Sequence, residues 1–449
     1  MKKLFLLYEE IHGTNCIPNN FGMTKEEHTV HRVGNQIKKS FSRIRENFIE
    51  EYEVHGEEFS GSIPLSMATF EANTETYLKE GLVLYPIIFS QGFKTYYHLT
   101  SIGMSSWINF LPEKIKQWCY EDKIKILLHF PLEEITFIDM SALYKVLGDI
   151  GFRKQNVLVS SPWKIPENIL SRSDLKIHKE NVICSFHQEI VTIDTLRRLH
   201  GDYNESERPV TPTKKYISLC RRYLPNRIKV HTYLIENDLL QYGYNSIPSN
   251  STVTDTSLST FTKEVKEEYY KNINLELCEE YWRKHGEGIT LDSNPLKETE
   301  RLGGPEAQVW GFNNRNSLKD EYLNSYLSII VEEDPYQFPY FFILSEKTFR
   351  PIFYKHLFIL IGNQFLLRSL REKGYQTFDS LWDESYDEIF DEEERVEAAL
   401  KQAKDLILSP DLPELYNKAK SILEHNYNIL ATRSKPGVLR DEILRKYHD

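Results

Sequence analysis

Residues Leu327–Gly374 read LSIIVEEDPYQFPYFFILSEKTFRPIFYKHLFILIGNQFLLRSLREKG. Two apolar runs within this stretch, Leu327–Val331 and Leu357–Ile361, have the length and composition of buried β-strands. Between them, Ser345-Glu346-Lys347 opens a segment of helical character, and a second helical segment follows over Gln364–Lys373. This order of strand, helix, strand and helix is the repeating unit of a parallel α/β sheet.

The same alternation of strands and helices runs through roughly the first 190 residues. Strands are predicted at Leu4–Tyr8, Leu82–Phe89, Ile124–Phe130, Asn156–Ser160 and Val182–Phe186. Helices are predicted at residues 24–50, Trp107–Trp118 and Asp139–Ile150. Because neither GxGxxG nor GxxxxGK[ST] occurs, the sequence contains no dinucleotide fingerprint and no P-loop motif.

Residues 201–214, GDYNESERPVTPTK, are polar and contain two prolines, which is typical of a linker. The strand–helix pattern restarts after them, and a chain of 449 residues is long enough for two domains. We therefore predict an α/β protein with two Rossmann-like domains that face each other across a cleft. The predicted parts are an N-terminal domain over residues 1–200, the linker, a second domain over 215–430, and a C-terminal helix over 431–449.

The second half contains further predicted elements. These are a strand at Lys215–Cys220, a helix at Asn226–Leu240 with Asn226 as its N-cap, a polar loop at 244–260, and closing helices at 392–407, 411–429 and 437–448. Residues 378–394 carry a dense run of acidic side chains. Such a run is usually a solvated face, and we expect the same here.

Composition limits the class of protein. The formal net charge is −11, which argues against non-specific nucleic-acid binding because that requires an excess of Lys and Arg. The five cysteines are far apart and form no CxxC pair, which argues against a disulfide framework or a zinc cluster and suits a reducing cytoplasm. No run of about 18 apolar residues occurs, so no membrane span is expected.

The start of the predicted helix at Ser345 is a candidate anion site. Ser345 can cap the helix, which places Glu346 and Lys347 in its first turn at the carboxyl edge of the sheet. A cation there can meet a diphosphate, and a carboxylate can accept two hydrogen bonds from a ribose diol. Glu332 ends the preceding strand at the same edge. The alternative is an ordinary capped helix with a surface Glu and Lys.

Two other groups of polar residues follow predicted strands. Arg222 and Arg227 lie between a strand and a helix, where arginines and a helix N-terminus together favour an anion, although surface arginines are the alternative. Glu10 and His12 follow the first strand, and Glu133 follows the strand at Ile124–Phe130. Ligands bind at the carboxyl ends of strands in open α/β sheets, but solvated turns would have the same composition.

The run from Val331 to Gly362 resembles the donor-binding part of GT-B glycosyltransferases, above all the α1,3-fucosyltransferase type and related uncharacterised phage and bacterial proteins. Glu346 and Lys347 stand where that family has a Glu-Lys pair. Arg227, with Arg222 as the second candidate, matches an arginine that contacts the donor diphosphate. The resemblance covers roughly residues 214–400, and it departs from the family at His356-Leu357, where a small residue and Pro are usual.

This resemblance implies a glycosyltransferase that moves a sugar from a GDP- or UDP-linked donor to an acceptor, which could be a glycan, a protein or a modified nucleic acid. It implies that Lys347, Arg227 and Ser345 at the helix N-terminus stabilise the leaving diphosphate, with Glu346 and Glu332 beside them. Glu10, His12 and Glu133 are candidates for the base that activates the acceptor hydroxyl. The sequence has no Asp-x-Asp, which fits metal-independent catalysis without a cofactor.

Two alternatives remain open. The first is a phage-type glycosyltransferase acting on a modified DNA base, which would need a basic groove despite the charge of −11. The second is a GT-B-like scaffold that binds a ligand or partner without turnover. An ion pair between Glu346 and Lys347, with both side chains directed to solvent, would favour the scaffold.

Overall fold

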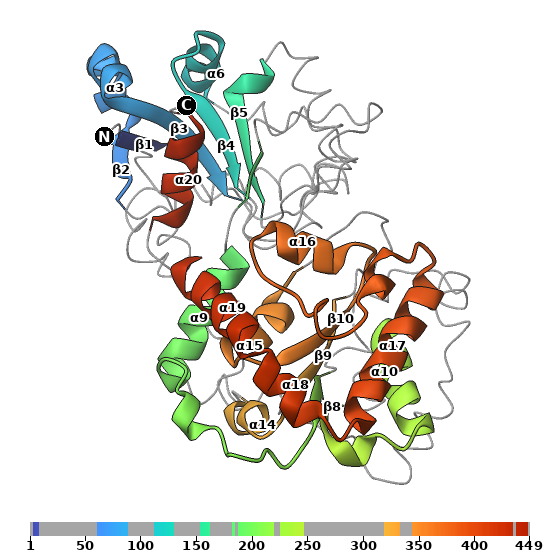
Figure 1. Cartoon of the computed structure of the whole chain (residues 1–449). Coiled ribbons are helices and arrows are strands. Elements are labelled where there is room, and N and C mark those ends of the chain that lie inside the picture. The colour runs from blue at the N-terminus through green and yellow to red at the C-terminus, as the bar shows by residue number, and fades with distance from the viewer. Residues whose placement is uncertain are drawn as a thin grey trace, which may run out of the picture. The chain divides into compact units, whose positions relative to one another are not determined.

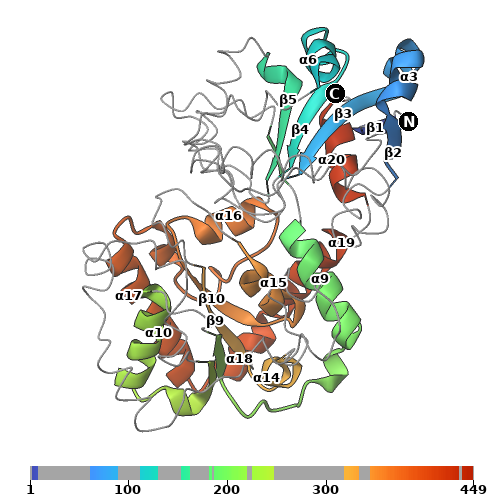
Figure 2. The ribbon, with the colours of Figure 1, turned by 180° about the vertical axis from the view of Figure 1, so that it is seen from behind.

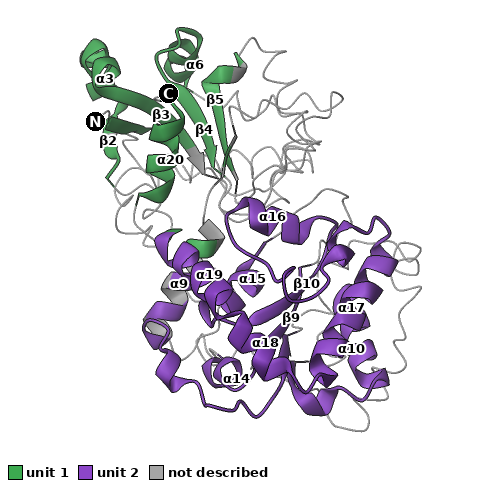
Figure 3. Cartoon of the chain, viewed as in Figure 1, with its two compact units in different colours: residues 1–191, 433–449 green, residues 192–432 purple. Residues whose placement is uncertain are grey.

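A computed structural model of the chain describes residues 3–8, 61–88, 112–129, 153–161, 182–184, 187–219, 225–246, 318–332, 344–433 and 437–447. The protein is mixed α/β, and each pairing between described strands is parallel. The chain divides into two compact units (Figure 3), residues 1–191 with 433–449 and residues 192–432. Residues 201–214 lie in the second unit.

The first unit contains a six-stranded sheet in the order β2-β1-β3-β4-β5-β6. Its strands are β1 (Lys3–Tyr8), β2 (Ile63–Ser66), β3 (Gly81–Ile88), β4 (Lys125–His129), β5 (Val157–Ser161) and β6 (Val182–Cys184). Its helical elements include α2 (Met67–Ala72), α3 (Thr74–Glu80), α6 (Glu113–Tyr120), η2 (Lys154–Asn156) and α20 (Val438–Lys446). The order of the first five strands is that of flavodoxin-like doubly wound sheets.

In the first unit, β1 near the N-terminus and α20 near the C-terminus lie side by side (Figure 1). Leu6, Leu84 and Leu127 come from three adjacent strands and pack together, as expected where alternate residues of each strand face one side of a sheet. Leu439 and Ile443 of α20 complete this cluster, and both are fully buried. The first unit therefore takes part of its core from residues that follow the whole second unit in sequence.

The second unit contains a four-stranded sheet in the order β10-β9-β7-β8. Its strands are β7 (Tyr216–Leu219), β8 (Gly243–Ser246), β9 (Leu327–Val331) and β10 (Leu357–Ile361). The ranges predicted for β9 and β10 are confirmed at every residue, and the two strands pair in register from Leu327 with Leu357 onward. All ten of their residues are buried, which explains why nine of them are apolar; the exception is Ser328.

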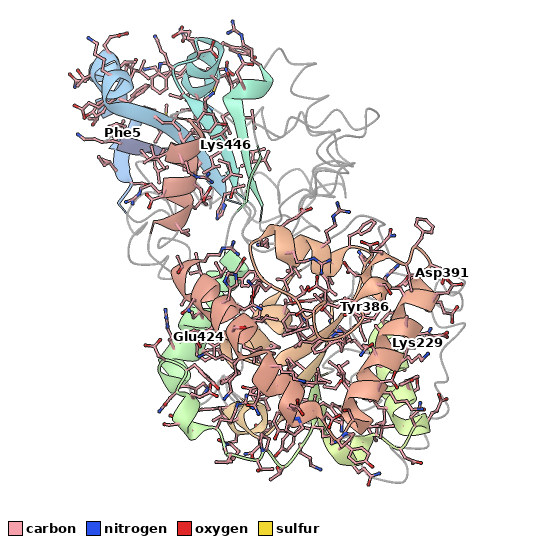
Figure 4. All side chains as sticks on the ribbon, in the orientation of Figure 1. Phe5, Lys229, Tyr386, Asp391, Glu424 and Lys446 are labelled. Atoms are coloured by element: carbon pink, nitrogen blue, oxygen red, sulfur yellow. The ribbon has the colours of Figure 1, made fainter. Side chains whose placement is uncertain are left out.

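Helices cover this sheet (Figures 1 and 2). They are α10 (Pro225–Glu236), α14 (Lys319–Leu323), α15 (Glu346–Phe353), α16 (Leu366–Glu372), α17 (Glu392–Leu408), α18 (Leu412–Lys418) and α19 (Lys420–Arg433), with α9 (His187–His200) entering the unit and short turns η4 (Glu205–Glu207), η5 (Leu240–Tyr242) and η10 (Ser385–Glu388). Helices α10 and α17 lie side by side, with Lys229 Nζ of α10 at 3.4 Å from Glu393 Oε1 of α17. Figure 4 labels Lys229 together with Asp391, the N-cap of α17.

The strand order of the second unit reverses between β7 and β9. The connection from β7 runs outward to β8, whereas the connection from β9 runs the other way to β10. Because such crossovers are right-handed, the helices α10 and α15 that make them belong to opposite faces of the sheet. Ligands of open α/β sheets bind at the carboxyl ends of the strands on either side of this reversal.

Three sequence-based predictions in the second unit are wrong. Helix α10 begins at Pro225, so Asn226 is not its N-cap but a first-turn residue whose Nδ2 donates to Glu392 Oε1 at 2.7 Å. Proline is favoured at the first helical position because its missing N–H would have no partner there. Residues 244–246 belong to strand β8, and the segment 411–429 contains two helices, α18 and α19.

Strand β8 was missed because its sequence, GYNS, is polar. The buried Asn245 nevertheless has partners, since Tyr216 Oη donates to its Oδ1 at 2.9 Å and its Nδ2 donates to the carbonyl of Leu240 at 3.1 Å. These hydrogen bonds remove the cost of burying the amide, which the local sequence does not reveal.

The acidic run 378–394 is also not a uniformly solvated face. Asp387 is buried and caps α16, because its two carboxylate oxygens accept from the backbone N–H groups of Leu367 and Arg368 at 2.8 and 3.0 Å. Glu384 is buried as well, and it accepts from the N–H of Phe378 at 2.8 Å. Burial raises the pKa of both carboxyl groups. The predicted helices at residues 24–50 and Asp139–Ile150 lie outside the described residues.

The dependence of the first unit on α20 gives a stability prediction. Ile443→Ala should lower the free energy of unfolding of the first unit by about 2–5 kcal/mol, because it leaves a cavity against the sheet. Hydrogen exchange of the β4 amides would report this loss. Arg445→Ala, on the exposed side of the same helix, is the control and should change stability by less than about 0.5 kcal/mol. Unchanged protection of β4 in Ile443→Ala would contradict the assignment.

Candidate functional site

The carboxylate of Glu332 fixes the start of α15 to the end of β9. Ser345 donates to it from its backbone N–H at 2.7 Å and from its hydroxyl at 2.8 Å, and the Thr348 hydroxyl donates to Oε1 at 2.7 Å. All three residues are buried. The negative charge of Glu332 therefore lies against the positive end of the helix dipole, where it stabilises the helix.

Lys347 has three polar contacts at this helix start, of which only the one with Glu346 joins two partly exposed side chains. Its Nζ lies 2.9 Å from Ser345 Oγ, 3.3 Å from Glu346 Oε1 and 3.7 Å from Glu332 Oε2. The side chains of Lys347 and Glu346 are each 34% exposed. Partly exposed ion pairs contribute only about 0–1 kcal/mol, so a phosphate could replace Glu346 as the partner of Lys347 at little cost.

Glu346 is ionised across the physiological pH range. Burial raises the pKa of its carboxyl group, but the charges of Lys347 and Arg350 outweigh that effect and lower the pKa to about 2. The carboxylate can therefore accept hydrogen bonds from two neighbouring hydroxyl groups without competing protonation.

Gly362 permits the close approach of β10 to Glu332. A Cβ at position 362 would lie 2.5 Å from the Glu332 carbonyl oxygen, which is backbone and cannot move aside. The N–H of Glu332 also donates to the carbonyl of Ile361 at 2.8 Å. The backbone of Glu332 is thus fixed from β10, and its side chain from α15.

Arg227 lies in the first turn of α10, which follows β7. The residue is only 5% exposed, and its Nε is buried without a hydrogen-bond partner. No described residue forms a hydrogen bond or ion pair with its guanidinium group. A buried cation without a counter-ion is costly in an isolated protein, and an anionic ligand would remove that cost.

His231 follows Arg227 by one helical turn and is also buried. Burial, and then the positive charge of Arg227, lower the pKa of His231 to about 3. The imidazole is therefore neutral at physiological pH, and the positive charge at this end of α10 belongs to Arg227.

His356 stands where the resembling family has a small residue, and it has a structural role. Its Nε2 donates to the carbonyl of Tyr322, so its Nδ1 accepts the hydroxyl proton of Ser328 at 3.0 Å. Burial and then the charge of Arg208 lower the pKa of His356 well below its usual value. This neutral histidine joins β9 and β10 on the inside of the second unit.

The described residues bring four of the predicted site residues together. Glu332, Ser345, Glu346 and Lys347 meet where β9 ends, and Arg227 begins the helix after the neighbouring strand β7. The other candidates, Glu10, His12, Glu133 and Arg222, lie outside the described residues. His129, on β4, is buried and contacts Ser160 Oγ at 3.1 Å through its Nδ1, as expected of a core histidine.

Sequence reasoning missed Thr348 and His231. Thr348 stands three residues after the N-cap Ser345, and His231 stands four residues after Arg227, so both spacings could have been read as one face of a helix. The sequence did not reveal that Glu332 accepts hydrogen bonds from the hydroxyl groups of both Ser345 and Thr348.

Among the described residues, no group of three or more His, Cys, Asp or Glu side chains could hold a metal ion. No described helix is long and apolar enough to cross a lipid bilayer.

No protein-family model and no curated protein sequence matches this chain. Among solved structures, it is similar to one described as "Trehalose-6-phosphate from E. coli bound with UDP-2-fluoro glucose". The two chains are 10% identical, with a TM-score of 0.39, over 99% of this chain and 93% of that one. A TM-score below 0.5 does not establish a shared fold, so the function proposed below rests on the residues of this chain.

The buried hydrogen bond between the Thr348 hydroxyl and Glu332 gives a stability prediction. Thr348→Val should lower the free energy of unfolding by about 1–3 kcal/mol, because a buried carboxylate oxygen loses a donor while the side-chain shape is kept. Thr348→Ser keeps the hydroxyl and should cost less. Urea unfolding of the two variants would test this. A larger loss in Thr348→Ser would show that the methyl group, not the hydrogen bond, is important.

The neutral His356 predicts that the second unit loses stability in mild acid. Its folded-state pKa lies well below 6.5, so below that pH the unfolded chain binds a proton that the folded chain does not. The stability that it contributes is present above pH 6.5 and declines as the pH falls, by at most about 1.4 kcal/mol per pH unit for one proton. The stability difference between wild type and His356→Gln should therefore shrink between pH 7 and pH 5 in urea unfolding. A constant difference would exclude the titration.

Proposed function

We propose that the second unit binds a nucleotide sugar through its diphosphate and that the protein is a GT-B-type glycosyltransferase. The observation that carries this proposal is the buried guanidinium of Arg227, which has no counter-ion among the described residues. It lies in the first turn of the helix that follows β7, on one side of the strand-order reversal, and Lys347 lies in the first turn of the helix that follows β9 on the other. A diphosphate supplies the missing negative charge.

Each residue of the site has a chemical task in this proposal. Arg227 and Lys347 stabilise the negative charge that develops on the leaving nucleoside diphosphate. The dipole of α10 adds partial positive charge at the N-terminal end where Arg227 lies. When a phosphate replaces Glu346 as the partner of Lys347, the Glu346 carboxylate is free to accept hydrogen bonds from the ribose hydroxyl groups.

Glu332 positions the site and does not contact the donor. Its oxygens already accept from Ser345 and Thr348, and it is only 3% exposed. Its negative charge partly cancels the dipole of α15, so the cation that α15 offers to a phosphate is Lys347. Glu332 and Ser345, predicted to act beside the diphosphate, instead fix the direction of Lys347.

The remaining parts of the proposal concern the acceptor. Residues 1–200 form the acceptor domain and 215–430 the donor domain, and the donor is GDP- or UDP-linked. One of Glu10, His12 and Glu133 acts as the base for the acceptor hydroxyl, and Arg222 assists Arg227. The leaving group is neutralised by side chains and not by a metal ion. The acceptor is a glycan, a protein or a modified nucleic acid.

A second candidate function is a scaffold that binds a nucleotide or a partner without turnover. The observation that favours it is the contact between Lys347 Nζ and Glu346 Oε1 at 3.3 Å, with both side chains partly exposed. In such a scaffold this pair would persist in the presence of nucleotides. Hydrolysis or transfer of a bound nucleotide sugar would distinguish the enzyme from the scaffold.

Thermal-shift screening against GDP, UDP, CMP and ADP tests the donor site. A ligand at 100 times its dissociation constant should stabilise the protein by about 2.7 kcal/mol. Lys347→Met should weaken binding of that nucleotide about tenfold, which removes about 1.4 kcal/mol of the stabilisation. A shift with one nucleotide that is smaller in this variant would support the proposal and identify the base of the donor.

The matched control is Lys229→Met. Lys229 is also on a helix of the second unit, but it pairs with Glu393 and Glu397 of α17 at 3.4 and 3.7 Å. Lys229→Met also removes one positive charge, but away from the proposed diphosphate site, so the affinity for the nucleotide should stay at the wild-type value. Absence of any shift in the wild-type protein would refute nucleotide binding, and equal losses in both variants would show only a general charge effect.

A further inference from the structure

Two buried side-chain nitrogens of α10, in residues one helical turn apart, have no hydrogen-bond partner. They are Arg227 Nε and His231 Nδ1, in residues that are 5% and 2% exposed. A buried polar atom without a partner costs about 1–3 kcal/mol and is uncommon in folded proteins. Two such atoms on consecutive turns of one helix indicate that a common arrangement satisfies both.

The chemistry of the two atoms is complementary. Residues four apart lie on one helix face, and the side chain of a helical residue leans toward the N-terminus, so the imidazole of His231 lies over the turn that carries Arg227. Arginine can only donate hydrogen bonds, whereas a neutral imidazole has one nitrogen that accepts. His231 is neutral because burial and the charge of Arg227 hold its pKa at about 3.

We infer that His231 is a positioning residue for the diphosphate site, an inference that rests on the function proposed above. One buried water accepts the Nε–H of Arg227 and donates to Nδ1 of His231, because the two nitrogens form no direct hydrogen bond, and Nε2 of His231 carries the proton. This water bridge fixes the plane of the guanidinium group. The two terminal amino groups of Arg227 then face the ligand as a fork.

A neutral partner suits this task better than the carboxylate that usually pairs with arginine. A carboxylate would orient the guanidinium but would also cancel its charge, and so weaken its attraction for a phosphate. His231 orients Arg227 and leaves its charge for the ligand. A fixed fork binds two oxygen atoms of one phosphate, here the β-phosphate of the donor, which a monophosphate lacks.

Calorimetric titration of the full chain with UDP, GDP, UMP and GMP tests the inference. His231→Leu should weaken binding of the preferred diphosphate about tenfold and binding of its monophosphate much less. His231→Asn places a carbonyl oxygen near the position of Nδ1 and should restore binding to about the wild-type value. Equal losses in His231→Leu and His231→Asn would overturn the inference, because they would show that His231 acts through packing.

A double-mutant cycle separates positioning from general destabilisation. In an Arg227→Gln background, His231→Leu should cause no further loss of affinity, because there is no guanidinium left to orient. The same loss in both backgrounds would overturn the inference.

Nitrogen NMR of His231 gives a readout that needs no ligand. The inference expects Nδ1 to be unprotonated and hydrogen-bonded near pH 7, and it expects Arg227→Gln to raise the pKa of the imidazole. A proton on Nδ1 would overturn it. If the wild-type protein binds no nucleotide, the proposed function fails, and this spectrum still decides whether His231 and Arg227 are paired.

Discussion

The site depends on the contact between the Glu332 carboxylate and the start of α15. Ser345 and Thr348 donate to this carboxylate, and the backbone of Glu332 is fixed in turn by Gly362 and Ile361. These contacts join the end of one central strand to the helix that follows it and to the neighbouring strand. The direction in which Lys347 leaves the helix is therefore set by buried groups, although Lys347 itself is partly exposed.

The two cations of the site are held in different ways. Lys347 pairs with Glu346, and it can exchange this partner for a ligand at little cost because both side chains are partly exposed. Arg227 is buried and has no described counter-ion, so it gains more from a bound anion. In the proposed reaction, Arg227 supplies most of the affinity for the diphosphate, and Lys347 exchanges Glu346 for a phosphate when the donor binds.

Local sequence was enough to locate β9, β10 and the Ser345 cap, because buried parallel strands are continuous apolar runs and capping depends on neighbouring residues. It was not enough where a partner distant in sequence decides the outcome. Asn245 is buried in a strand because Tyr216 satisfies it, and Asp387 is buried because the start of α16 needs an acceptor. The local sequence around Asn245 or Asp387 does not show that either residue has a partner that allows its burial. The same holds for Glu332, whose position was predicted but whose partners were not.

The packing of α20 has a consequence for the order in which the chain can fold. The core of the first unit includes Leu439 and Ile443, which are synthesised only after residues 192–432. While the second unit is being made, the first unit lacks part of its core and exposes the apolar side chains of its sheet that α20 later covers. Contacts between residues so distant in sequence form slowly, and incompletely covered sheets are prone to aggregate. The second unit can therefore complete its fold first, although the first unit begins the chain.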